Sequence, residues 1–148
     1  MQIWVDADAC PRAAKDVLFR AADKRAVLTT LVANQYLKTP PSKYIQAIQV
    51  AQGFDVADNE IVARLEPGDL VITADIPLAD EVIAKGGAAI SPRGVVYSAE
   101  NIKDILSRRD MMEQLRDSGM VSGGPDEYAK KDVQAFANAL DRYLTRHG

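Results

Sequence analysis

The chain has 148 residues, of which 47% are hydrophobic, and this length favours one compact domain over residues 1–148. Eighteen Lys and Arg residues against 21 Asp and Glu residues give a formal net charge of −3, so the protein as a whole does not attract polyanions. The only histidine is His147 and the only cysteine is Cys10. Zinc sites and imidazole-dependent nucleophiles are therefore not expected, and a bound metal ion would have oxygen ligands.

The amino-terminal residues lack the basic stretch and long apolar run of a signal peptide, and no apolar segment is long enough to span a bilayer. A single cysteine cannot form an intramolecular disulfide, which suits a reducing compartment. We therefore expect a cytoplasmic protein with no membrane partner.

Strand and helix patterns alternate along the chain. Short apolar or β-branched runs predict strands, whereas apolar residues three or four apart predict helices. Pro11 fits a first helical turn, and Gly86 follows a helix end. In chain order we expect a strand at 3–6, a helix at 11–21, strands at 26–33 and 44–51, a helix at 56–65, a strand at 69–74, a helix at 77–85, a strand at 88–90, and helices at 100–116 and 125–146.

Two connections complete this pattern. Residues 37–43 contain two adjacent prolines and must form a loop, and residues 118–124 are expected to be a flexible segment between the last two helices. Continuous apolar strands that alternate with helices are typical of a parallel sheet covered on both faces. The sequence therefore predicts an α/β fold, a three-layer sandwich with a mainly parallel central sheet.

Polar side chains stand where the predicted strands end. Parallel α/β sheets bind ligands just beyond the carboxyl ends of their strands, so these residues are expected at one edge. They are Asp6, Asp8, Asn34, Asp55, Asp58, Asp75, Ser91 and Arg93. Most of them are acids.

Converging aspartates predict a divalent cation site. Mg²⁺ and Mn²⁺ take oxygen ligands, and Mg²⁺ needs only one or two carboxylates beside water or phosphate. Asp55 and Asp58 are three residues apart at a helix start and can share a face. The candidate ligands are Asp6, Asp8, Asp55, Asp58, Asp75 and Asp80, with Asp8 and Asp80 in supporting positions.

Helix capping is the simpler alternative for some of these acids. Asp is a favoured residue at helix N-termini, and Asp8, Asp55 and Asp75 each precede a predicted helix. Capping does not require an acid at Asp6 or a second acid at Asp58. The combination therefore favours a metal site.

Three segments carry a resemblance to a known family. They are Val5-Asp6-Ala7-Asp8-Ala9-Cys10-Pro11, Asp55-Val56-Ala57-Asp58-Asn59-Glu60-Ile61 and the run from Gly68 to Ala79, with support from Ser91–Gly94 and Gly123–Pro125. Over nearly the whole chain, the sequence resembles the uncharacterised bacterial YaiI/YqxD-like proteins, which are related to PIN-like nuclease domains.

The resemblance implies a PIN-like fold and a metal-dependent nuclease that cuts phosphodiesters, with RNA favoured over DNA as the substrate. PIN-like enzymes use an acid after the first strand, one opening a central helix and one after a Thr-x-Asp strand end. These match Asp6, Asp58 and Asp75, which become the candidate catalytic residues. A further PIN acid, a Glu on an earlier helix, has no counterpart. The candidate substrate-binding residues are Asn34, Ser91 and Arg93, with Arg93 facing a phosphate.

Two alternatives stay open. Asp6-Ala7-Asp8 also resembles haloacid-dehalogenase-like phosphatases, in which the first Asp attacks phosphorus and the second protonates the leaving group. Against this, Pro11 leaves no room for the usual loop and flap, and Cys10 stands where Thr or Val is expected. The second alternative is a non-catalytic PIN-like binding module that uses the acidic edge for a structural cation or a protein partner.

Overall fold

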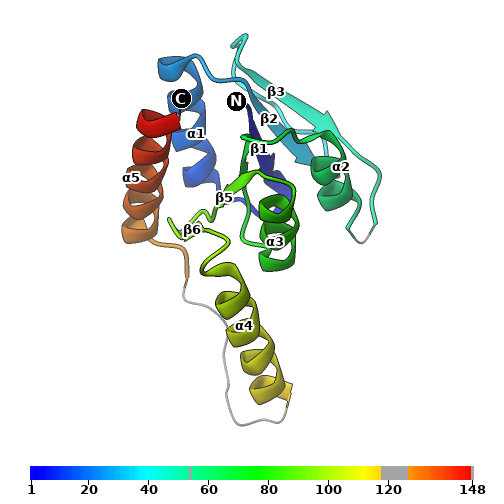
Figure 1. Ribbon diagram of the computed structural model, residues 1–148. Helices are drawn as coiled ribbons and strands as arrows, with labels where there is room; N and C mark the ends of the chain where they lie inside the picture. The colour runs from blue at the N-terminus through cyan, green and yellow to red at the C-terminus, as the bar shows by residue number, and fades with distance from the viewer. Residues whose placement is uncertain (54, 118–126, 148) are drawn as a thin grey trace.

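The computed structural model describes residues 1–53, 55–117 and 127–147, and these form one six-stranded sheet between two layers of helices (Figure 1). The strands are β1 (Ile3–Asp6), β2 (Thr29–Ala33), β3 (Ile45–Gln49), β4 (Leu70–Ile72), β5 (Ala88–Ile90) and β6 (Val96–Tyr97). Their order is β3-β2-β1-β4-β5-β6. The first five are parallel, and β6 pairs antiparallel with β5.

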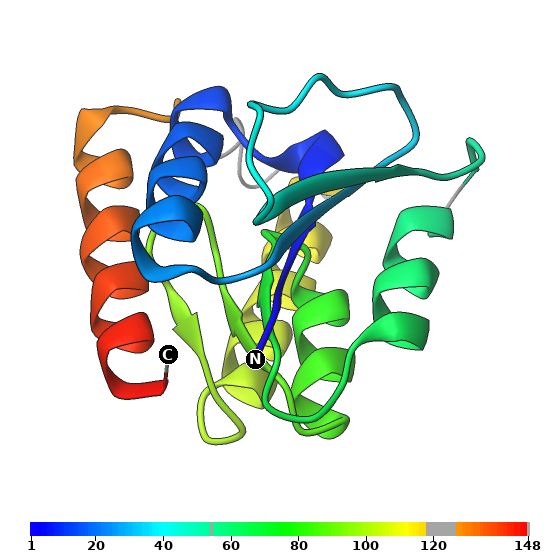
Figure 2. The ribbon, with the colours of Figure 1, turned by 90° about the horizontal axis from the view of Figure 1, so that it is seen from above.

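The helices cover both faces of the sheet, as the sequence predicted (Figure 2). They are α1 (Arg12–Arg25), α2 (Val56–Arg64), α3 (Ile76–Ala84), α4 (Ile102–Asp117) and α5 (Lys130–His147), with a short 3-10 turn, η1, at Ala7–Ala9. Helices α1 and α5 bury their apolar residues on one face with Ile3 and Val5, while α2, α3 and α4 cover the other face around Trp4. The three-layer α/β prediction is therefore confirmed.

The buried strands are apolar on both faces because helices exclude water from each side. Every residue of β1, β2 and β4 is buried. The edge strand β3 is instead largely exposed: Ile45 is buried, whereas Gln46, Ala47 and Gln49 are exposed. Asp69, just before β4, accepts hydrogen bonds from the Trp4 indole N–H and from two backbone N–H groups, which ties the starts of β1 and β4 together.

The chain changes direction between β1 and β4, and this point positions the candidate site. From β1 the chain moves outward to β2 and β3, and α2 then carries it back across the sheet to β4 and on to β5. Neighbouring strands whose connections leave in opposite directions open a crevice at their carboxyl ends. Asp6 ends β1 and Asp75 follows β4, the two strands that border this crevice.

The predicted elements differ from the structure at several points. Strand β6 was missed, because two residues carry no detectable period. The predicted strand at 26–33 begins only at Thr29, because Ala26 adopts a left-handed conformation, with φ of 54°, that ends α1. Helix α5 begins at Lys130, since residues 127–129 are not helical and Asp132 Oδ2 accepts a hydrogen bond from Ala129 N–H, which fixes the helix start there.

The predicted segment at 118–124 and the Gly123–Pro125 motif lie outside the described residues. None of the helices in the described part of the chain is both long enough and apolar enough to cross a bilayer.

Candidate metal centre

Asp6 and Asp75 are connected through one buried hydroxyl group. Asp6 ends β1 and is only 8% exposed. Thr73, which follows β4, donates from Oγ1 to Asp6 Oδ2 at 2.9 Å and accepts from Asp75 N–H at 3.0 Å. The hydroxyl thereby uses its donor and one acceptor site to fix both residues. Sequence analysis singled out the two acids but not Thr73, although it lies two residues before Asp75.

Asp55 and Asp58 come from the start of α2, beside α3 (Figure 1). Asp55 adopts a left-handed backbone conformation, with φ of 62°, immediately before the helix. Such a conformation is uncommon for a residue with a side chain, although Asp tolerates it better than most. It turns the chain into α2 so that Asp58, in the first turn, lies on the same side as Asp55.

The carboxylates of Asp55, Asp58 and Asp75 form a compact group, here called the aspartate cluster. One oxygen of each residue lies within 4.8 Å of one oxygen of the other two. Around an octahedral Mg²⁺ or Mn²⁺ ion, neighbouring ligand oxygens are about 3 Å apart and opposite ones about 4 Å apart. Small side-chain rotations would bring the three oxygens to those separations. The donor set therefore fits a hard divalent cation.

The electrostatics of the cluster are those of crowded acids. The pKa of Asp58 is raised from its ordinary 3.8 to about 7, first by burial, then by a hydrogen bond with Asp75 and by the charges of Asp6, Asp75 and Asp55. The pKa of Asp6 is also raised, first by burial and then by repulsion from Asp75 and Asp8, against the lowering effect of the Thr73 hydrogen bond. A cation bound among these groups would relieve both penalties.

The aspartate cluster opens into a cavity of about 230 Å³, here called the aspartate cavity. Its lining residues are Asp55, Asp58, Asn59, Asp75, Pro77, Leu78, Glu81 and Arg109. Asn59, Glu81 and Arg109 were not predicted. Asn59 adjoins Asp58, and Glu81 lies on α3 six residues after Asp75, so helix geometry could have suggested them. Arg109 comes from α4, and no sequence spacing connects it to the aspartates.

Helix capping accounts for only one of the acids to which it was assigned. Asp75 Oδ1 accepts a hydrogen bond from Leu78 N–H at 3.0 Å and therefore caps α3. Asp55 precedes α2 but makes no such bond from its side chain. Asp8 lies within η1, and the residue before α1 is Pro11. Capping thus leaves Asp6, Asp55 and Asp58 unexplained.

The other predicted ligands lie outside the aspartate cluster. Asp8 is exposed, and its Oδ2 accepts a hydrogen bond from the backbone N–H of Asn34 at 2.9 Å. It contributes to the site through its charge, which raises the pKa of Asp6. Both oxygens of Asp80 contact Lys103 Nζ, at 2.9 and 3.1 Å, so Asp80 faces α4.

Ser91 and Arg93 lie on the turn after β5, and Arg93 contacts the start of α5. Ser91 Oγ is buried and accepts from the backbone N–H groups of Arg93 and Val95. Arg93 Nη1 forms an ion pair with Asp132 Oδ2 at 3.1 Å, and its guanidinium lies 5.6 Å from the ring centre of Tyr128. These contacts give Arg93 a role in anchoring α5 to the sheet edge.

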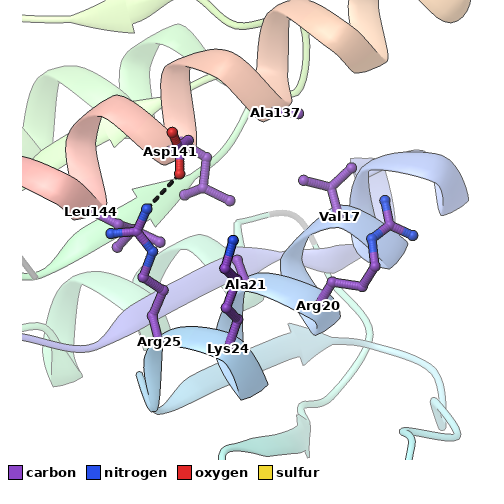
Figure 3. Close-up of a pocket in the computed structure, with 9 residues that line it drawn as sticks. Val17, Arg20, Ala21, Lys24, Arg25, Ala137, Asp141 and Leu144 are labelled. Atoms are coloured by element: carbon purple, nitrogen blue, oxygen red, sulfur yellow. Dashed lines mark hydrogen bonds and ion pairs between the residues drawn. The ribbon is translucent and has the colours of Figure 1, made fainter.

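A second hollow, of about 320 Å³, lies between α1 and α5 (Figure 3). Its floor is apolar, and Arg20, Lys24 and Arg25 border it. Arg25 forms an ion pair with Asp141, shown by the dashed line in Figure 3. These cations occupy the last turns of α1, at the opposite end of the helix from Asp6 and Asp8. The hollow is therefore separate from the aspartate cavity.

Comparisons with known proteins identify a family. The family model described as "Uncharacterized BCR, YaiI/YqxD family" matches residues 4–146. A UPF0178 protein of Shewanella amazonensis is 64% identical over 146 residues, which cover 99% of this chain and 98% of that relative. UPF0178 proteins of Yersinia pestis and Yersinia pseudotuberculosis are each 62% identical over 144 residues, which cover 97% of this chain and 95% of the relative. No solved structure matches the chain. The chain therefore belongs to the YaiI/YqxD family.

Proposed function

We propose that the protein is a divalent-metal-dependent phosphodiesterase that cuts nucleic acid, with single-stranded RNA as the favoured substrate. The observation that carries the proposal is the convergence of oxygens from Asp55, Asp58 and Asp75, within 4.8 Å of one another, at the border of a cavity. The expected relation to PIN-like nucleases, which assigns catalytic roles to Asp6, Asp58 and Asp75, supports the same reaction.

The aspartate cluster would hold Mg²⁺ or Mn²⁺, which when bound lowers the pKa of a coordinated water molecule and offsets charge that develops on phosphate. Binding requires Asp58 to release its proton, because a carboxylic acid is a poor ligand. Asp6 is fixed by Thr73 and, as a buried base beside the cluster, can orient the attacking water and accept a proton from it. Two hydrogen bonds fix Asp75: its backbone N–H donates to Thr73 Oγ1, and its carboxylate accepts from the backbone N–H of Leu78.

The test is a cutting assay with end-labelled single-stranded RNA and single-stranded DNA, in Mn²⁺, Mg²⁺ or EDTA. Parent protein should cut only with metal, and RNA faster than DNA. Asp58→Asn and Asp75→Asn should each reduce cutting at least about a hundredfold, as loss of a metal ligand or its support typically does. Asp141→Asn is the matched control, because it removes the same charge from the α1–α5 side and should cut normally.

The phosphatase alternative makes a different prediction in the same assay series. It requires Asp6 and Asp8 to reach one phosphate, whereas each has an oxygen engaged, by Thr73 and by the Asn34 N–H respectively. If the protein hydrolyses a small phosphomonoester and leaves both oligonucleotides intact, the nuclease proposal is wrong. If Mn²⁺ binds in calorimetry and neither substrate class reacts, a non-catalytic metal-binding module remains.

A further inference from the structure

Arg109 is the cationic residue that lines the aspartate cavity within the described part of the chain. Four acids line the same cavity: Asp55, Asp58, Asp75 and Glu81. One divalent cation would offset only part of that charge, so a phosphate entering the cavity still meets net negative potential. A fixed positive group on the opposite wall is what such a substrate requires.

The position of Arg109 on its helix is unusual for a charged residue. Helix α4 packs against α3 with Ile102, which is buried, and with Ile105, which is partly buried. Arg109 follows four residues after Ile105 and seven after Ile102, so it continues the inward-facing stripe of α4. Its side chain is 38% exposed, whereas the apolar Met111 is 59% exposed. An arginine therefore occupies an inward position at the point where α4 reaches the aspartate cavity.

A neighbouring arginine differs in each of these respects. Arg108 is 74% exposed, does not line the cavity and forms an ion pair with Asp104, one helical turn before it, at 2.7 Å. Arg109 also has an acidic neighbour, since its Nη1 lies 3.8 Å from Asp110 Oδ1, but it differs from Arg108 in its lower exposure and in lining the cavity. The two arginines thus provide a cavity-facing residue and a surface control on one helix.

We propose that Arg109 is a substrate-binding residue that holds a non-bridging phosphate oxygen pair of the nucleic acid against the aspartate cluster. This rests on the proposed function, since it assigns the phosphate-binding wall of that same site. A guanidinium suits the task because it can donate two parallel hydrogen bonds to one phosphate and stays charged at all relevant pH values. The cavity then has two walls with separate tasks: α2 and α3 supply the metal ligands, and α4 supplies the phosphate contact.

The experiment measures binding of a fluorescein-labelled single-stranded RNA by anisotropy in Ca²⁺, and binding of Mn²⁺ alone by calorimetry. Arg109→Gln should weaken RNA binding about tenfold and reduce its salt dependence by about one phosphate contact. Arg109→Lys should recover part of the affinity, which a purely structural role would not predict. Arg108→Gln should change RNA affinity less than about twofold, as expected for an exposed ion pair. Mn²⁺ affinity should be equal or slightly higher in Arg109→Gln.

The outcomes separate the two proposals. If Mn²⁺ and RNA bind the parent and the Gln variants of Arg108 and Arg109 weaken RNA binding equally, the assignment of Arg109 is wrong while the metal site stands. If RNA does not bind the parent at all, the assignment is also overturned. If Mn²⁺ does not bind the parent but RNA affinity still depends on Arg109, the proposed metal-dependent function fails and the phosphate contact is retained.

Discussion

Replacing Asp58 with Asn tests the aspartate cluster through stability, independently of any substrate. In metal-free buffer the folded-state pKa of Asp58 is raised to about 7, whereas its ordinary value is 3.8. The folded protein therefore favours the protonated form of Asp58. The contribution of Asp58 to the free energy of unfolding is fully present below pH 3.8 and is lost as the pH rises to about 7. Asn resembles the protonated acid and keeps a donor for Asp75. The free energy of unfolding of Asp58→Asn should therefore not fall over this pH range.

The size of the effect follows from the position of Asp58. The full pKa change would cost about 4 kcal/mol for a fully buried carboxyl, but Asp58 is half-buried and solvent screening reduces the cost to about 1.5 kcal/mol. Asp58 also lies in the first turn of α2, where a carboxylate gains about 0.5 kcal/mol from the helix dipole. Above about pH 7 without metal, Asp58→Asn should therefore be more stable by about 1 kcal/mol.

Matched urea melts of the parent, Asp58→Asn and Asp141→Asn provide the measurement. With EDTA, the advantage of Asp58→Asn should grow as the pH rises to about 7 and then stay constant. With Mn²⁺ at about a hundred times its dissociation constant, the parent should gain about 2.7 kcal/mol and the variant less, so that their order reverses. Asp141→Asn should show neither effect. An advantage of Asp58→Asn that changes with neither pH nor metal would refute the reasoning.

Three further predictions concern other parts of the molecule. Burial raises the pKa of the Cys10 thiol to about 12. Near pH 8, the native protein should therefore react with iodoacetamide at less than about a tenth of the rate of free cysteine, measured by mass spectrometry. Equal rates would contradict this burial. The Asp69 carboxylate accepts from N–H donors on both of its oxygens, so in either orientation Asp69→Asn puts its amide donor against at least one of them. Urea melts should show a loss of about 2 kcal/mol, and an unchanged midpoint would argue against these bonds. Gly94 has φ of 90°, and a Cβ there would lie 2.7 Å from the Ala135 backbone. Gly94→Ala should therefore lower the free energy of unfolding by at least about 2 kcal/mol in the same urea melts. A loss below about 0.5 kcal/mol would count against this packing.

The sequence predicted the sheet because strands such as β1 and β4 are short, nearly continuous apolar runs, which distinguishes them from the helices between them. Strand β1 was predicted from three apolar residues and helix α1 from four apolar residues and one proline; the structure confirms both, with α1 continuing to Arg25, four residues beyond its predicted end. The spacing of Asp55 and Asp58 also predicted a shared face, and both line the aspartate cavity. Local periodicity is sufficient for these features because each depends on neighbours within one or two turns.

Features that depend on packing between distant elements could not be predicted in this way. Asp80 lies five residues after Asp75, which turns its side chain to another side of α3, where it meets Lys103 of α4. Arg93 forms an ion pair with Asp132, 39 residues away, which no local pattern indicates, and its expected phosphate contact stays a prediction. Arg109 reaches the aspartates only through the docking of α4 on α3. No spacing within the chain contains that information.

The pairing of β1 with β4 has a consequence for folding kinetics. Ile3 lies opposite Leu70 in the register, so this pair closes a loop of about 67 residues, and contacts of such separation form late and slow folding. The aspartate cluster needs that pair, because Asp75 follows β4. We expect a cation to bind only once this pair and the aspartate cluster have formed, and a ligand absent from the transition state slows unfolding without speeding folding. Metal would then lengthen the lifetime of the native protein while leaving its refolding rate unchanged.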